Sequence, residues 1–382
     1  MIKIKFENLL VSIVVSVVVF FNTISTTMLD RTFFQVKVNF LFLVVLLLGL
    51  RFLYKMRVSY KYLILSILLL LSGVLVYFQT NRLNFLVYSM LLVLLVNVDM
   101  KVVLRNYVVV AGILVVGVFL LSLVGMVPNL QYNRAGVIRN SFGFIYPTDF
   151  ASHCFYLFLA ISYLLKDKFI WTRSLFGVLL SAFIIKYCDA RLNAVSILLA
   201  TVIFIYFYYS NGKKLKIFAL LPYSAVVFAS TVTYLSYKFS WSNPFLVSIN
   251  KLITGRLALG RNAFDTFGVH LFGTRNVQFI GSGGKTESVI GYNYVDSSYV
   301  QMLFTYGIVP VVLLIIIYVV ASRKQYKDGQ YLLVAILSLI AFNCMIEAFW
   351  FVPTYNIFMF LLFTTNTFSK KESNDITKLN AT

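Results

Sequence analysis

Long uninterrupted apolar runs constrain this chain more than any other feature of its sequence. Stretches such as SLFGVLLSAFII and AVSILLATVIFIYFYY belong to segments of about 17–25 residues, the length a helix needs to cross a membrane. The runs do not alternate between polar and apolar residues, which favours membrane helices over a barrel. With 60% hydrophobic and 12% charged residues, a soluble fold would leave too much apolar surface in water. We therefore predict an all-α, polytopic integral membrane protein with a single domain over residues 1–382.

We expect twelve membrane spans, because twelve apolar runs follow one another along the chain. Two connections between them are far longer than the rest, a first outer loop at 128–148 and a large outer loop at 237–296. Loops of this length are usually functional or disordered, and the second loop does not have the composition of a disordered segment. The expected spans are 8–27, 36–54, 62–79, 83–99, 107–127, 149–165, 170–187, 191–210, 215–236, 297–321, 330–348 and 352–369.

Basic residues are concentrated in the short segments on one side of this map. If the N-terminus lies inside, the cytoplasmic segments hold 20 of the 33 Lys and Arg residues. An excess of Lys and Arg in short cytoplasmic loops orients membrane helices, so the net charge of +20 does not indicate nucleic acid. We expect the first run to be retained as a helix and both termini, including the tail 370–382, to be cytoplasmic.

The large outer loop has apolar residues at helical spacing. Pro244 suits the start of a helix, and Gly268 lies near its expected end. We expect an amphipathic helix lying at the outer membrane surface. Its apolar face consists of Leu246, Ile249, Ile253, Leu257, Phe264 and Phe267.

The stretch KYCDARLN places two charges, Asp189 and Arg191, between two apolar runs. A charge in the middle of a span costs several kcal/mol, and the map puts this stretch at the outer turn between the seventh and eighth spans. One interpretation is an ion pair near the interface, since arginine at a helix end extends its head group toward water. The other is that Asp189 fixes Arg191 so that it binds an anionic ligand.

Arginine is frequent on the outer side, against the usual orientation bias. Because arginine keeps its charge in apolar surroundings and binds phosphate bidentately, several arginines at membrane level suit a lipid pyrophosphate. A transporter for an anionic solute also fits, as does structural pairing of Arg261 with Asp265 at i, i+4. The candidate anion-binding residues are Arg139, Arg191, Arg256 and Arg261.

Neither a metal nor a cofactor is expected. The acidic residues are scattered, with no DxD, HExxH or paired-histidine spacing. There is also no Walker loop, GxSxG elbow or Rossmann fingerprint. The three cysteines, Cys154, Cys188 and Cys344, form no CxxC pair. If the protein is an enzyme, arginine takes the place of a metal.

Four stretches together resemble the Wzy-type polysaccharide polymerases and the related O-antigen ligases. RNSFGFIYPTDFASH is similar to the family's Arg-x-Ser-x-Gly-Phe stretch, and CDARLNAVSILLA to its Ser/Asp-x-Arg pattern opening a long helix. TGRLALGRNAFDTFGVHLFG, followed by FIGSGG, is similar to the Ser/Thr-Gly-Arg segment. VDSSYVQMLFTYGIVP is similar to the stretch that opens the next helix.

The resemblance implies a fold like the GT-C-like polymerase and ligase enzymes, and metal-independent glycosyl transfer on the outer face of a bacterial cytoplasmic membrane. A sugar hydroxyl of one lipid-linked repeat unit would attack C1 of a glycan carried on undecaprenyl pyrophosphate, which leaves. Membrane lipids, a flippase and a chain-length regulator are the implied partners. The implied substrate-binding residues are Arg139, Arg191, Arg256, Arg261, Asp189 and Tyr146, and the candidate catalytic residues are Asp296, His153 and His270.

Two alternatives to a capsule or exopolysaccharide polymerase remain. An O-antigen-type ligase would pass the glycan to another acceptor, but Asp296 stands where the ligases carry a histidine, which favours a polymerase. A flippase or other transporter of lipid-linked oligosaccharide is the second alternative. The sequence lacks the internal repeat typical of many transporters.

The charge distribution generates a test of the topology. A reporter fused after Lys214 should report the cytoplasm, and one inserted near Lys285 should report the outside, because the basic loops stay inside. Paired phosphatase and fluorescent-protein fusions measure this. The same side for both fusions contradicts the map.

Overall fold

The computed structural model describes residues 6–29, 60–134, 136–166, 168–210, 215–286 and 289–365. It is mostly helical, which confirms the prediction of an all-α membrane protein. Within these residues, seven helical segments are long and apolar enough to cross a membrane. They are α4 (Tyr60–Thr80), α6 (Met100–Leu123), α7 (Pro147–Leu165), α8 (Ile170–Cys188), α9 (Arg191–Tyr209), the segment Lys216–Lys238 that ends in α10 (Ser224–Lys238), and α14 (Ile308–Lys327).

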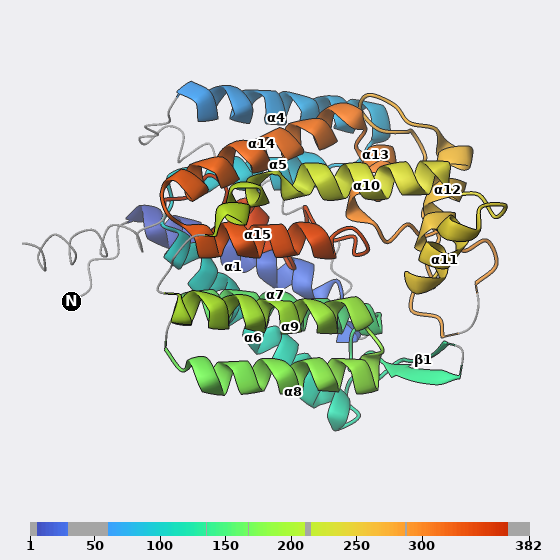
Figure 1. Ribbon diagram of the computed structural model, residues 1–382, viewed down its shortest axis with the longest axis horizontal. Helices are drawn as coiled ribbons and strands as arrows, with labels where there is room; N and C mark the ends of the chain where they lie inside the picture. The colour runs from blue at the N-terminus through green and yellow to red at the C-terminus, as the bar shows by residue number, and fades with distance from the viewer. Residues whose placement is uncertain are drawn as a thin grey trace, which may run out of the picture.

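The long helices lie side by side, and the shorter elements of the outer loops gather at one end of them (Figure 1). α7 is the central helix. In its apolar stretch 78% of the residues are buried within the protein, against 28% in α6 and in α8. α7 packs against α6 and α9, and α9 packs against α8. The neighbours of α7 are therefore protein, whereas α6 and α8 present most of their surface outward.

Small residues bring α8 and α9 into close contact. A Cβ on Gly177 would lie 2.8 Å from the Phe158 ring and would collide with the Thr201 hydroxyl. One turn along α8, Ser181 Oγ donates to the Ala194 carbonyl at 2.9 Å. Small residues let membrane helices approach closely, so only Asp189 and Ala190 are needed to connect this pair.

Several predicted spans are interrupted rather than continuous. The run 297–321 divides into α13 (Ser298–Thr305) and α14 at Gly307, whose φ is 93°. The run 215–236 begins with two short 3₁₀ helices around Pro222 before α10 starts. In 352–369, the described part forms turns and the short α16 (Ile357–Phe360) in a buried setting. The predicted span 36–54 lies outside the described residues, and the number twelve stays a prediction.

The remaining predicted spans correspond to shorter helices. The run 8–27 contains α1 (Phe6–Ile24), which packs against α6. The run 83–99 forms α5 (Asn84–Leu94) and then turns, and the run 330–348 forms α15 (Tyr331–Asn343) before Glu347. α15 packs against α9 and α10.

The large outer loop forms two helices where the sequence predicted one. α11 (Pro244–Leu252) begins at the predicted proline, and α12 (Arg256–Phe267) ends just before the predicted glycine. Between them Thr254 and Gly255 both have positive φ, 56° and 88°, which ends the first helix. The two helices stand at the end of the bundle beside α10 (Figure 1).

The apolar face of these two helices packs on protein. Leu246 and Leu257 form a buried cluster with Phe239, which follows α10. Phe264 and Phe267 contact the ring of Phe304 in α13, with centroids 5.0 and 6.1 Å apart. This apolar stripe therefore packs the loop onto the bundle.

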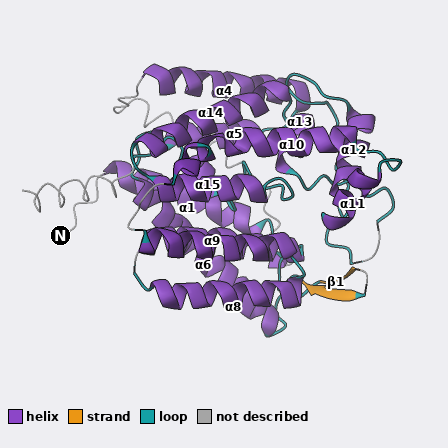
Figure 2. Cartoon of the chain, in the orientation of Figure 1, coloured by secondary structure: helices purple, strands orange, loops and turns teal. Residues whose placement is uncertain are grey.

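The first outer loop contains an antiparallel hairpin, which is the pair of strands that Figure 2 shows beside the end of α8. Strand β1 (Gln131–Arg134) pairs with β2 (Val137–Asn140), and Tyr132 stands opposite Arg139. The hairpin thus presents two arginines, Arg134 and Arg139, to the bundle.

The contact between Gly307 and Gly273 generates a stability test. A Cβ on Gly307 would collide with the Gly273 amide nitrogen, and its φ of 93° with ψ of 174° suits only glycine. Gly307→Ala should lower the free energy of unfolding by about 3 kcal/mol. Gly112→Ala is the control, because Gly112 lies within α6 with open space around it and alanine favours a helix. Thermal unfolding in detergent measures both, and equal midpoints would disprove the close-contact argument.

Candidate functional site

The hairpin is held on the carboxyl end of α8, where helix carbonyls lack partners. Arg139 Nε donates to the Cys188 carbonyl at 2.9 Å, and Asn140 Nδ2 donates to the Tyr187 carbonyl at 3.3 Å. Arg134 Nη2 donates to the Asp189 carbonyl at 3.0 Å. Cations are favoured at the negative end of a helix, so this end of α8 fixes both arginines of the hairpin in place.

Asp189 is the acidic centre of the KYCDARLN turn. It has a left-handed conformation with φ of 44°. One carboxylate oxygen pairs with Arg134, and the other accepts from Arg191 Nε at 2.8 Å. Burial alone would raise the pKa of Asp189, but the hydrogen bonds from Arg191 and Arg134 outweigh it and lower that pKa. Asp189 is therefore a structural anion between two arginines, one of which, Arg191, is 69% exposed.

The break between α11 and α12 places Arg256 at the start of α12. Asn250 caps this start, since its Oδ1 accepts from the amides of Leu257 and Ala258 at 3.0 and 3.1 Å. Arg256 Nε then lies 3.2 Å from the Ile346 carbonyl and 3.2 Å from Asp296 Oδ2. Burial raises the pKa of Asp296, while Arg256 opposes that shift. Through its bond to the Ile346 carbonyl, Arg256 joins the large outer loop to the segment that follows α15.

A cavity of about 290 Å³ lies where the hairpin, the start of α7, the start of α12 and the segment after α15 converge. A smaller adjoining cavity shares its arginines and adds Asp189 and Arg191. Burial and the neighbouring Arg134 lower the pKa of Arg139 to about 10, so this side chain stays charged at neutral pH. The charged residues around the larger cavity are Arg134, Arg139, Arg256, Asp149, Asp296 and Glu347.

Tyrosine rings form much of the uncharged wall. Tyr146 precedes Pro147 at the start of α7, and its hydroxyl accepts from the Gly283 amide at 2.7 Å. This bond holds the GSGG segment of the large outer loop over the cavity, and Tyr132, Tyr292 and Tyr294 complete the wall. Tyrosine thus gives the cavity apolar surface with hydroxyl groups at its edge.

A buried polar network lies beside the cavity. Asn343 donates to Asn193 Oδ1 at 3.2 Å and to Ser196 Oγ at 3.0 Å. Asn193 Nδ2 in turn lies 3.1 Å from Ser152 Oγ and 3.4 Å from Glu347 Oε1. Polar side chains among apolar helices are costly unless bonded, so this network fixes α7, α9 and α15 relative to Glu347.

Neither histidine lines the cavity, although His153 lies one turn along α7 from Asp149. His153 is fully buried, bonds Thr26 Oγ1 at 3.0 Å and stacks on Tyr355 with centroids 4.3 Å apart. Tyr355 stacks in turn on Phe349, which lines the cavity. His270 is exposed in a separate hollow beside Leu75 and Phe78. The structure therefore brings neither histidine among the cavity-lining residues.

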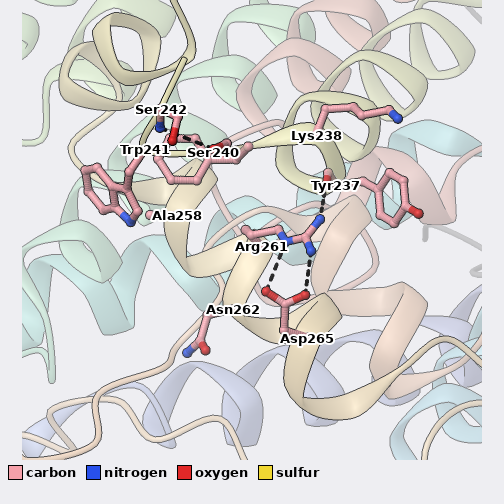
Figure 3. A pocket seen from close by; sticks show the side chains of 10 residues that line it. Tyr237, Lys238, Ser240, Trp241, Ser242, Ala258, Arg261, Asn262 and Asp265 are labelled. Atoms are coloured by element: carbon pink, nitrogen blue, oxygen red, sulfur yellow. Dashed lines mark hydrogen bonds and ion pairs between the residues drawn. The ribbon is translucent and has the colours of Figure 1, made fainter. Parts of the chain in front are cut away.

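Arg261 also lies elsewhere. Its guanidinium pairs with Asp265 at 2.8 Å one turn along α12 and donates to the Tyr237 carbonyl (Figure 3). This is the structural pairing considered from the sequence. The hollow around it contains Lys238 and Trp241 at the end of α10, and Arg261 is not among the residues that line the arginine-rich cavity.

Of the residues predicted for the site, the structure brings together Arg139, Arg191, Arg256, Asp189, Tyr146 and Asp296 around the two adjoining cavities. Sequence reasoning missed Arg134, Asp149 and Glu347 as site residues. Arg134 had a signal, because it stands five residues before Arg139 in the same outer loop. Asp149 and Glu347 sit at the ends of apolar runs, and only their position on the outer side marked them.

No protein-family model, curated protein sequence or solved structure matches this chain. Within the described residues, no group of three or more His, Cys, Asp or Glu side chains is arranged to hold a metal ion.

Docking of the hairpin through Arg134 generates a prediction. Arg134→Gln removes a charged hydrogen bond to buried Asp189 and should cost about 1.5–3 kcal/mol of unfolding free energy. Arg191→Gln should cost about 0–1 kcal/mol, because Arg191 is mostly exposed. Thermal unfolding of the purified variants measures the difference.

The same comparison has a defined pH dependence. Since the folded pKa of Asp189 is lowered, its contribution is complete above the usual aspartate pKa and is lost as pH falls through the lowered value. The deficit of Arg134→Gln should be constant from about pH 5 to 8 and shrink only below about pH 4. A deficit equal to that of Arg191→Gln would contradict the docking role.

Proposed function

We propose that this protein is a Wzy-type polymerase that joins lipid-linked oligosaccharide repeat units into a capsular polysaccharide or exopolysaccharide. The observation that carries the proposal is the convergence of Arg134, Arg139 and Arg256 on one cavity at the end of the helical bundle that the predicted topology places outside. Undecaprenyl pyrophosphate, an anion on a lipid tail, fits this combination of charge and location. The protein would act in the cytoplasmic membrane of a bacterium, with twelve spans and both termini inside.

The arginines fit the leaving group of glycosyl transfer. As the bond between C1 and the pyrophosphate breaks, negative charge grows on the pyrophosphate oxygens. Fixed guanidinium groups at a site shielded from water stabilise such charge without reorganising. Arg139 is fixed by the end of α8 and Arg256 by the Ile346 carbonyl, so both are held in position before a ligand arrives.

The tyrosines fit the sugars. Tyr132, Tyr146, Tyr292 and Tyr294 offer ring surface and hydroxyl groups on the side of the cavity formed by the hairpin and the GSGG segment. Pyranose rings have both apolar faces and hydroxyl edges, so this wall suits the reducing-end sugar of the donor and the acceptor sugar. The cavity thus offers guanidinium groups for the pyrophosphate and tyrosine rings for the glycan.

Reconstitution tests the function directly. Protein in liposomes, supplied with defined undecaprenyl-pyrophosphate-linked repeat units, should produce a ladder of polymer lengths. Synthesis should persist in excess EDTA, because arginines rather than a metal stabilise the leaving group. Arg256→Lys should lose nearly as much rate as Arg256→Ala, about 10²–10³-fold, because lysine lacks the planar fork.

Arg275→Lys is the matched control, since Arg275 is an exposed arginine of the same outer loop. Transfer of the glycan to an acceptor that is not lipid-linked would indicate a ligase. Transbilayer movement of the repeat unit without new glycosidic bonds would indicate a transporter. Restoration of a chelated sample only by Mg²⁺ or Mn²⁺ would contradict the metal-independent mechanism.

A further inference from the structure

Three carboxylates line the arginine-rich cavity, and two of them already have partners. Asp296 forms an ion pair with Arg256 at 3.2 Å. Asp149, in the first turn of α7, forms a side-chain hydrogen bond with Tyr355. Asp296 is one of the candidate catalytic residues named from the sequence, and in the structure its carboxylate pairs with an arginine. The third carboxylate, Glu347, is in a different situation.

Glu347 is 5% exposed and lines both adjoining cavities. Among the described residues, its carboxylate has no ion-pair partner within 4.0 Å. The one hydrogen bond that this carboxylate accepts from a described residue comes from Asn193 Nδ2 at 3.4 Å. A neutral amide at that distance orients a carboxylate but leaves it able to accept a proton. Glu347 is thus the buried carboxylate of the cavity that remains available to a ligand.

The backbone around Glu347 is bonded to the start of α13 and to Arg256. The Ser298 amide donates to the Glu347 carbonyl at 3.2 Å, and Ser298 stands two residues after Asp296. The carbonyl of the preceding residue, Ile346, accepts from Arg256. Glu347 is therefore attached both to the start of α13 and to the arginine that faces the pyrophosphate in the proposed reaction.

We propose that Glu347 is the general base of the proposed glycosyl transfer, and that Asp296 positions Arg256. This assignment rests on the proposed function. The acceptor hydroxyl oxygen forms a bond to C1 of the donor sugar as its proton passes to the Glu347 carboxylate. The bond from C1 to the pyrophosphate oxygen breaks, and its electron pair leaves with the lipid pyrophosphate. Water later takes the proton from Glu347.

The buried amides of Asn193 and Asn343 orient the Glu347 carboxylate. Asn193 and Asn343 are linked to each other and to serines of α7 and α9, so Asn193 keeps its amide hydrogen directed at Glu347. Both asparagines are neutral. Arg256 and Arg139 are close enough to act on the Glu347 carboxylate electrostatically, but among the described residues neither forms an ion pair with it. A base needs that freedom, since a cation held against it would make it a weaker proton acceptor.

The test uses the reconstituted full-length protein and a synthetic undecaprenyl-pyrophosphate-linked repeat unit. Glu347→Gln should lower the polymerisation rate at saturating substrate about 10²–10⁴-fold, while binding of the repeat unit, measured by native mass spectrometry, stays within about threefold. The fall in wild-type rate on acidification should disappear from the residual rate of Glu347→Gln. Asp265→Asn, the same carboxylate-to-amide change in an exposed pair outside the cavity, should keep the wild-type rate.

Glu347→Asp is a second variant in case Glu347→Gln does not fold. It keeps the carboxylate but moves it back by one methylene group. Its rate should fall at least about tenfold with the acid limb retained, since small misplacements of a base are costly. Full activity in either Glu347 variant, with wild type active, overturns the base assignment and leaves the proposed function standing. Wild type that binds the repeat unit but makes no polymer overturns the proposed function and, with it, this assignment.

Discussion

The docking of the hairpin on the carboxyl end of α8 is the interaction on which the arrangement of the site depends. The last carbonyls of α8 and the Asp189 carboxylate need donors at this end of the bundle, and Arg134, Arg139 and Asn140 supply them. Because Arg134 and Arg139 donate hydrogen bonds to the carbonyls at this helix end, both side chains are held in one place beside the cavity. A structural requirement of a helix end thereby fixes the charges that line the cavity.

Interruption of helices supplies the other side of the cavity. The positive φ values at Thr254 and Gly255 end α11 and turn Arg256 toward Asp296. Gly307 separates α13 from α14. Asp296, just before α13, lines the cavity, whereas α14 is one of the helices long enough to cross a membrane. Irregular backbone at the edge of a membrane is tolerated where protein satisfies its polar groups. Here the irregular segments are those that present the charged side chains.

The sequence predicted the class of the fold and the start and end of the outer helical region well. Pro244 and Gly268 bound that region in the structure as expected, because their backbone preferences are local. The break at Thr254–Gly255 was missed, since the apolar spacing continues across it. For the site, arginine frequency on the outer side found Arg139 and Arg256. The same criterion included Arg261, whose nearest partner is one turn away on its own helix.

The sequence by itself determined what depends on local composition, namely apolar runs long enough for membrane helices. From the Lys and Arg distribution it also predicted an orientation and an outer side rich in arginine. Only the tertiary structure decided which charges meet. Arg134 reaches Asp189 across 55 positions, Arg256 reaches the Ile346 carbonyl across 90, and Asn193 reaches Glu347 across 154. Such pairings follow from the packing of helices in three dimensions, and no local pattern encodes them. Isolated acids at the ends of apolar runs, such as Glu347, acquire their chemical setting only when those helices come together.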